Sequence, residues 1–196
     1  MLMAQTTQAW TLAELDRLPD DGNKYELVDG ELFVTPAPSP AHETLAAELL
    51  FILIPYVHSQ RLGLVFTPRS VVRQQGSEVE PDMMVRPATP TLAKTWAEMP
   101  TPLLVVEILS RTTRRRDHEQ KRAFYLRIGV AEYWIVDRLT RSICVIRSNA
   151  DDVVCESELV WFPTGVTEAL QVDVAAYFVS ALGAPEASSG RGAKTP

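Results

Sequence analysis

Two carboxylates and a lysine, Asp82, Glu107 and Lys121, are the residues of this sequence best suited to chemistry. Glu107 interrupts the apolar run 103–109, whose continuous aliphatic and β-branched residues predict a strand buried on both faces. A carboxylate in such a strand is costly unless it is paired, hydrogen-bonded or bound to a metal. Asp82 lies in a second predicted strand, residues 79–85, and Lys121 lies on the helix expected after the buried strand. The three predict a divalent-metal site for phosphodiester cleavage, in which the carboxylates hold Mg²⁺ or Mn²⁺ and the lysine orients a water or stabilises charge on the phosphate.

The helix that carries Lys121 is predicted over residues 114–128, and Gly129 ends it. Its apolar stripe contains Phe124, Tyr125 and Ile128, and Lys121 falls on the same stripe one turn earlier. A lysine in that position either extends along the stripe to solvent or points its ammonium inward at a carboxylate. The presence of two candidate carboxylate partners favours the inward orientation.

The predicted helix 40–54 begins with Ser39 as its N-cap and Pro40 as its first residue, and Pro55 is expected to end or kink it. His42 lies on the apolar stripe of this helix. Spacing alone favours a hydrogen-bonded histidine at a helix end over a histidine aimed at the site.

A β-hairpin is predicted over residues 25–34, because Asp29-Gly30 suits a two-residue turn with positive φ angles. In that register Glu26 shares a strand face with Glu31 and Phe33, opposite the face of Tyr25 and Leu27. The strand pattern by itself therefore predicts an exposed Glu26.

The 196-residue chain has a net charge of −6, but the charge is unevenly distributed. Residues 111–127 contain seven basic and two acidic side chains, a net charge of +5, which leaves −11 for the rest. A basic helix on an acidic body could guide a polyanion such as DNA to one place, with Arg114, Arg115 and Arg116 as its contacts. The alternative is a solvated helix face without a ligand.

Composition excludes several other classes of protein. No apolar run reaches the length of a membrane span, and the N-terminus lacks the pattern of a signal peptide. Cys144 and Cys155 lack metal-ligand spacing and are expected to be packing residues of a cytoplasmic protein. No glycine-rich phosphate loop or Ser/His/Asp arrangement is present, and no organic cofactor is expected.

The remaining pattern predicts a second hairpin over 131–147, a weak strand at 156–162 and a closing helix over 173–182. Residues 1–182 would then form one domain, with its core at about 20–150. Residues 183–196 are small and polar and are expected to be a disordered tail.

These residues resemble the Uma two family of bacterial restriction endonucleases, within the PD-(D/E)XK nuclease superfamily. The resemblance covers most of residues 20–150, and the order and spacing of its motifs are more specific than any single motif. The matching stretches are 25–32, 36–42, Pro81-Asp82, 105–110, 117–125 and 129–137.

The resemblance implies a mixed β-sheet core flanked by helices, an α/β or α+β architecture, with an N-terminal β-hairpin extension. Asp82 fills the Pro-Asp position and Glu107 the second acidic position, whereas Leu109 stands where the superfamily has its lysine. The family's lysine then comes from the following helix, at Lys121. The superfamily's glutamate on an early helix has no counterpart on the expected face. Glu26 and His42 are the family's other matching polar positions, and they are expected to take part in catalysis by supporting the metal ligands or assisting proton transfer.

The expected function is that of a Mg²⁺-dependent (or Mn²⁺-dependent) endonuclease that hydrolyses DNA, acting as a homodimer whose two sites face the two strands. The alternative is a catalytically degenerate nuclease fold that serves as a nucleic-acid-binding or protein-interaction module.

Overall fold

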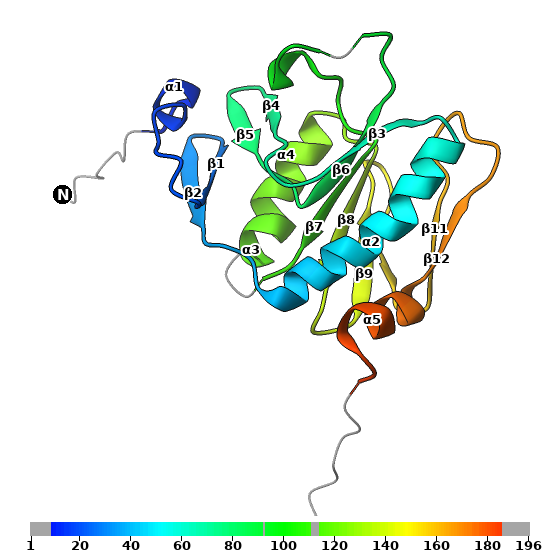
Figure 1. Cartoon of the computed structure of the whole chain (residues 1–196). Helices are drawn as coiled ribbons and strands as arrows, with labels where there is room; N and C mark the ends of the chain where they lie inside the picture. Colours follow the sequence, from blue (N-terminus) through cyan, green and yellow to red (C-terminus); the bar gives the residue numbers. More distant parts are fainter. Residues whose placement is uncertain (1–8, 92, 111–113, 186–196) are drawn as a thin grey trace, which may run out of the picture.

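The computed structural model describes residues 9–91, 93–110 and 114–185 of the chain, and its centre is a mixed β-sheet (Figure 1). The six strands lie in the order β10-β9-β8-β7-β6-β3. Only β7 and β8 pair in parallel; the other neighbours are antiparallel. The strands are β3 (Gly63–Phe66), β6 (Met83–Pro87), β7 (Leu104–Ile108), β8 (Glu132–Asp137), β9 (Ser142–Ile146) and β10 (Val153–Cys155).

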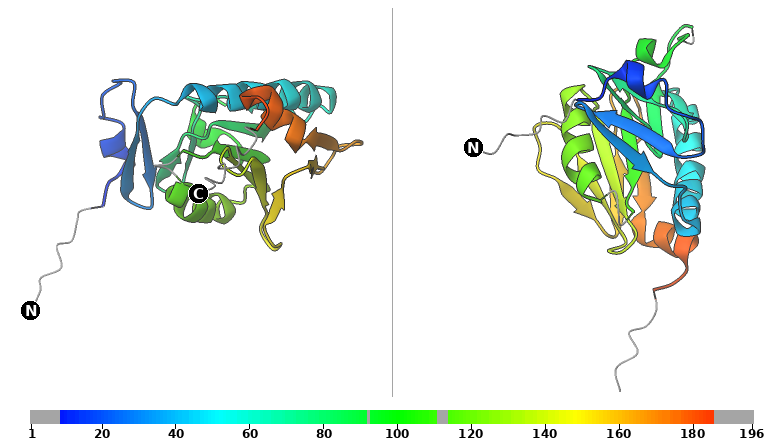
Figure 2. Two further views of the ribbon diagram at one scale, coloured as in Figure 1. Left: turned by 90° about the horizontal axis from the view of Figure 1, so that it is seen from below. Right: turned by 90° about the vertical axis from the view of Figure 1, so that its left-hand side faces the viewer.

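Helices cover both faces of this sheet (Figure 2, left). On one face lie α2 (Pro40–Ser59) and α5 (Val174–Leu182). On the other lies a three-part helix, α3 (Arg114–Arg116), the π-helical segment η2 (Asp117–Lys121) and α4 (Arg122–Arg127). The predicted architecture, a mixed sheet flanked by helices, is confirmed.

The alternation of side chains along β7 decides which layer each residue meets. Val106 and Ile108 join the hydrophobic core under α2 and α5, whereas Val105 joins the core under α4. Glu107, two positions after Val105, therefore faces the layer that carries Lys121. All five residues of β7 are buried, as its continuous apolar pattern predicts.

The N-terminal extension is a second, smaller sheet beside the core (Figures 1 and 2). Its four strands lie in the order β2-β1-β5-β4. The predicted hairpin is confirmed in its register, with Glu26 opposite Phe33, and in its turn, where Asp29 and Gly30 have φ angles of 50° and 84°. The small sheet combines the N-terminal hairpin, β1 (Lys24–Val28) and β2 (Glu31–Thr35), with β4 (Val72–Gln74) and β5 (Ser77–Val79) from the middle of the chain, and α1 (Leu12–Leu15) precedes the hairpin.

Three local predictions need correction. The strand expected over 79–85 is broken at residues 80–82, because Pro81 cannot donate to a ladder and the chain passes there from the small sheet to the central one. Asp82 therefore lies in a connection between strands. Pro55 does not end α2, which continues to Ser59 and buries Val57 in the core. The helix expected over 114–128 contains the π segment instead of being α-helical throughout.

The C-terminal part differs from the sequence expectation by two additional strands. The closing helix is confirmed as α5, with Asp173 as its N-cap. Both β10 and β12 (Leu170–Asp173) were not predicted; β12 pairs with β11 (Glu158–Trp161) in a two-stranded sheet. The crossing over 87–102 contains one short 3₁₀ helix, η1 (Trp96–Glu98).

The limits of the domain stay predictions, since most of the expected tail, residues 186–196, lies outside the described residues. Among the helices that the structure describes, none is long and apolar enough to cross a bilayer.

Candidate active site

Lys121 is at the centre of a buried ionic cluster beneath the sheet. Its side chain is fully buried, and its Nζ lies 2.7 Å from Oε1 of Glu26 and 2.8 Å from Oε1 of Glu107. Asp117, one turn earlier on the same helix, is 3.8 Å from the ammonium. The inward orientation, which the candidate carboxylate partners favoured, is confirmed.

The two end residues of the π segment are buried ionic residues on the inner face of the helix. The segment begins at Asp117 and ends at Lys121, and both are buried while neighbouring Glu119 is exposed. A π turn inserts one residue into the helical repeat, a local irregularity that often accompanies functional sites. Burial opposes charge on the lysine, but Glu107, Glu26 and Asp117 raise its pKa above the ordinary value.

Glu107 holds the cluster to the central sheet. Its Oε1 accepts hydrogen bonds from Lys121 and, at 2.7 Å, from the hydroxyl of Tyr125. Burial raises the pKa of Glu107 to about 7, with Lys121 opposing the shift and Asp117 and Asp82 adding to it. The lysine stays charged, and in a cluster this rich in carboxylates Glu107 is the group that takes up a proton.

Glu26, expected on the exposed face of its strand, is instead fully buried. The pattern-based prediction was wrong because the small sheet packs this face of β1 against the helical layer. Besides Lys121, Oε1 accepts a 2.9 Å hydrogen bond from the amide of Glu80, and Oε2 lies 3.2 Å from the guanidinium of Arg116. Burial opposes its ionisation, but Lys121, Lys24 and Arg116 lower its pKa to about 2.

Asp82 is fixed by the end of β7 and by α2. Its Oδ2 accepts a 2.7 Å hydrogen bond from the amide of Ile108 and lies 3.0 Å from Nε2 of His42. Burial disfavours the charged carboxylate, but His42, Lys24 and the Ile108 amide together lower its pKa to about 2. His42 is thus a hydrogen-bonded histidine at a helix end, as the spacing favoured, and its partner is a predicted site residue; the role of His42 in catalysis stays a prediction. Asp82 and Glu43 raise its pKa against the effect of burial.

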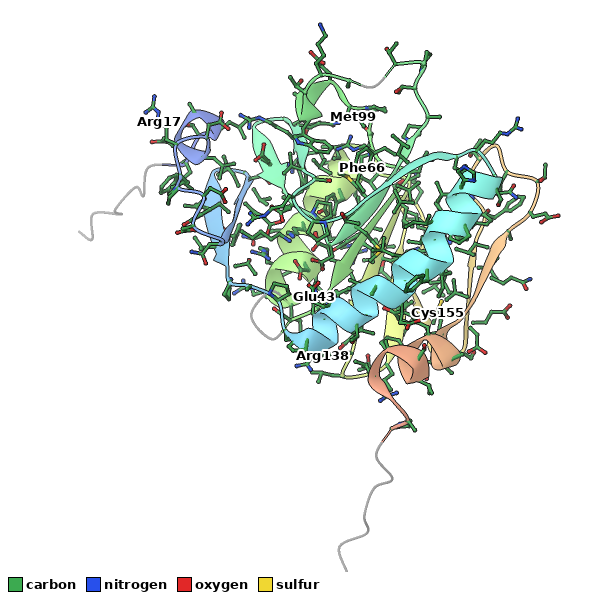
Figure 3. The ribbon with its side chains drawn as sticks, viewed as in Figure 1. Arg17, Glu43, Phe66, Met99, Arg138 and Cys155 are labelled. Carbon is green, nitrogen blue, oxygen red and sulfur yellow. The ribbon has the colours of Figure 1, made fainter. Side chains whose placement is uncertain are left out.

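These groups border a pocket of about 560 Å³. Asp82, Glu107 and His42 are among its lining residues, whereas Lys121 and Glu26 are not. Glu43 and Arg138, labelled beside the N-terminal end of α2 in Figure 3, also line it. Lys121 and Glu26 therefore lie behind the wall of the pocket, and their ionic partners Glu107, Asp117 and Arg116 line it.

The donor set on the pocket wall fits a hard divalent cation. Within the described ranges, hydrogen bonds engage Oε1 of Glu107 and Oδ2 of Asp82, and none is made by the second oxygen of either carboxylate. No group of three His, Cys, Asp or Glu side chains in the described part of the chain is arranged to hold a metal. Mg²⁺ commonly takes one or two protein carboxylates and keeps waters or phosphate oxygens as its other ligands, so the two carboxylates are of the right chemical type for this ion.

The three arginines expected to bind nucleic acid do not form one surface. Arg114 pairs with Asp137 at 2.7 Å, and Arg115 pairs with Glu119 at 3.0 Å. Arg116 is only 8% exposed, because it packs over the ring of Phe33 and reaches Glu26. The net charge of a segment does not show which of its arginines are paired with acidic residues in the folded protein. The role of these three arginines in DNA binding stays a prediction. Arg111 lies outside the described residues.

Lys24 was missed by the sequence reasoning. It lines the pocket, and its Nζ lies 3.7 Å from Glu26 and 3.8 Å from Asp82. Its signal was present, because it precedes Glu26 by two positions on β1 and so shares its strand face.

A solved structure and a family model agree with this fold. A "putative nuclease belonging to DUF820" from Anabaena variabilis superposes with a TM-score of 0.76 at 20% sequence identity, and the match covers 88% of this chain and 99% of the other. At that identity the likeness concerns the fold. No protein among those with curated descriptions matches the chain. The model of the Uma two family (Uma2), described as "Putative restriction endonuclease", matches residues 12–175. The chain therefore belongs to the Uma two family, in agreement with the resemblance of its motifs.

Proposed function

We propose that the protein is a metal-dependent endonuclease that hydrolyses phosphodiester bonds of DNA. One observation carries the proposal: Asp82 and Glu107, from a strand connection and an adjacent strand, border one pocket, with a lysine fixing Glu107 from behind. Membership of a family described as restriction endonucleases supports the reaction class.

The residues have separate tasks in this proposal. Asp82 and Glu107 would hold Mg²⁺ or Mn²⁺, which when bound polarises the phosphate and acidifies a water. The Ile108 amide and His42 hold Asp82 in place, and His42 on the pocket wall is suited to transfer a proton. Lys121 and Tyr125 hold Glu107 by the same carboxylate oxygen.

Cleavage of plasmid DNA in the presence of Mg²⁺ or Mn²⁺ tests this function. We expect Asp82→Asn and Glu107→Gln to lose both cleavage and the thermal stabilisation by metal, because each removes a charged hard ligand. Asp20→Asn is a matched control, since Asp20 is exposed and outside the pocket. A wild-type protein that neither cuts DNA nor is stabilised by metal would overturn the proposal.

The degenerate-nuclease alternative has one observation in its favour, namely that Lys121 is sealed off from the pocket and Leu109 occupies the superfamily's lysine position. Metal-independent DNA binding without cleavage would select this alternative. The homodimer also stays a prediction, and the mass of the protein in light scattering tests it.

A further inference from the structure

Several cations line the pocket, among them Arg116, Arg138 and Lys24, but the lysine that the sequence assigns to catalysis is sealed off from it. Lys121 is fully buried, and both carboxylates within hydrogen-bonding distance compete for its donors. It does not line the pocket. A catalytic group has to come within hydrogen-bond reach of the reacting atoms, which this lysine cannot do without breaking its ion pairs.

Lys24 has the opposite environment. Its side chain is 18% exposed and lines the pocket together with Asp82 and Glu107. Both of its ionic contacts, 3.7 Å to Glu26 and 3.8 Å to Asp82, are too long to be hydrogen bonds. Among the described residues no acceptor takes a hydrogen bond from this ammonium, which has three donors to offer.

The two carboxylates near Lys24 do not depend on it for hydrogen bonds. Glu26 already accepts from the amide of Glu80 and contacts Lys121 at 2.7 Å, and Asp82 accepts from the amide of Ile108. A lysine retained only to neutralise these carboxylates would make short contacts with them. Its distance from both instead leaves the ammonium able to turn toward an anion in the pocket.

We propose that Lys24 is the lysine that contacts the phosphate of bound DNA, whereas Lys121 is a positioning residue that acts through Glu107. This inference rests on the proposed nuclease function. It moves the substrate-contacting lysine from the helix, where sequence spacing placed it, to the first strand of the N-terminal hairpin. The hairpin thereby becomes part of the active site.

The test compares Lys24→Met, which removes the charge and keeps an unbranched apolar side chain, with Lys24→Arg. Lys94→Met is the matched control, because Lys94 is exposed and lies outside the pocket. Three quantities are measured for each variant: the cleavage rate at saturating DNA, the affinity for a labelled DNA duplex with Ca²⁺ in place of Mg²⁺, and the melting temperature with and without Mn²⁺.

We expect Lys24→Met to reduce the cleavage rate about 100- to 1,000-fold, the usual effect of removing one donor to a transition-state oxyanion. Its duplex affinity should fall, and its stabilisation by Mn²⁺ should be preserved, since no metal ligand is lost. Lys24→Arg should recover binding better than cleavage, because a planar fork does not reproduce a compact ammonium. Lys94→Met should behave as wild type.

The two proposals fail in different ways. A Lys24→Met protein that cuts DNA at the wild-type rate would overturn the role of Lys24 and leave the nuclease function standing. If the wild-type protein binds DNA without cutting it, the nuclease proposal fails. In that case a weaker duplex affinity of Lys24→Met supports Lys24 as a phosphate contact, and an unchanged affinity overturns it.

Discussion

At the scale of single residues, two buried carboxylates of the site, Glu26 and Glu107, share the ammonium of Lys121. Glu107 and Glu26 both contact Lys121 by one oxygen, yet burial raises the pKa of Glu107 while the surrounding cations lower that of Glu26. Glu26 has Arg116 and Lys24 in addition to Lys121. The protonation of Glu107 should therefore be visible in the stability of the metal-free protein.

We expect the metal-free protein to lose stability as the pH rises from about 5.5 to about 8. The folded-state pKa of Glu107 is raised to about 7 from an ordinary 4.5, so the folded protein binds more protons than the unfolded one in between. The pKa of His42 is also raised, and its stabilisation is complete below its ordinary value of 6.5 and lost as the pH rises through the folded-state value. The lowered pKa values of Asp82 and Glu26 act only at more acidic pH.

Urea unfolding in the presence of EDTA measures this loss, which should be on the order of 2 kcal/mol. Glu107→Gln should flatten most of the pH dependence, because glutamine stays neutral at every pH. A free energy of unfolding that rises between these two pH values would contradict the assignment.

At the scale of elements, local sequence patterns predicted individual helices and strands but could not predict how these elements pack against one another. The hairpin turn at Asp29-Gly30 follows from local spacing and is confirmed. The inward orientation of Lys121 is also confirmed, but its prediction needed the candidate carboxylate partners in addition to the spacing. The burial of Glu26 requires the small sheet to pack on a helix far along the chain. The break at residues 80–82 likewise arises because the residues before it join the small sheet and those after it join the central sheet. This tertiary arrangement cannot be predicted from a continuous strand pattern.

The three-part helix supplies Lys121, the positive charge shared by the buried carboxylates of Glu26 and Glu107. We expect Lys121→Met to lower the free energy of unfolding by roughly 3–5 kcal/mol, since it leaves Glu26 and Glu107 buried without their shared counter-ion. Lys94→Met, in an exposed loop, should change it by less than about 0.5 kcal/mol. Thermal and urea unfolding measure both, and near-equal stabilities of the two variants would contradict a structural role for Lys121.

At the scale of the whole molecule, the distribution of charge along the sequence differs from the distribution of charge in the folded structure. The segment 111–127 is strongly basic in sequence, but three of its described arginines are paired with acidic residues from other elements, namely Asp137, Asp152 and Asp29. Arg138, between β8 and β9, lines the pocket, although the sequence pattern did not predict it as a site residue. Pairing between distant elements therefore decides which cations remain available to a polyanion.

We expect Arg138→Ala to weaken DNA binding more than Arg115→Ala, although Arg115 is 88% exposed. Arg138 borders the pocket of the two carboxylates, so its loss should also reduce the slope of log affinity against log salt by about 1. Fluorescence anisotropy across a salt series distinguishes the two variants. A larger effect of Arg115→Ala would instead restore the basic helix as the binding surface.

The contact between Glu26 and Lys121 also bears on when the pocket forms during synthesis of the protein. The first strand emerges with a carboxylate whose counter-ion is still to be translated, because Lys121 follows the hairpin, α2 and three of the six strands of the central sheet. Closing so long a loop costs conformational entropy, which only the packed sheet offsets. A nascent chain therefore carries Asp82 and Glu107 before it can hold them in place, and the pocket takes its final shape only once the helix has packed beneath the sheet.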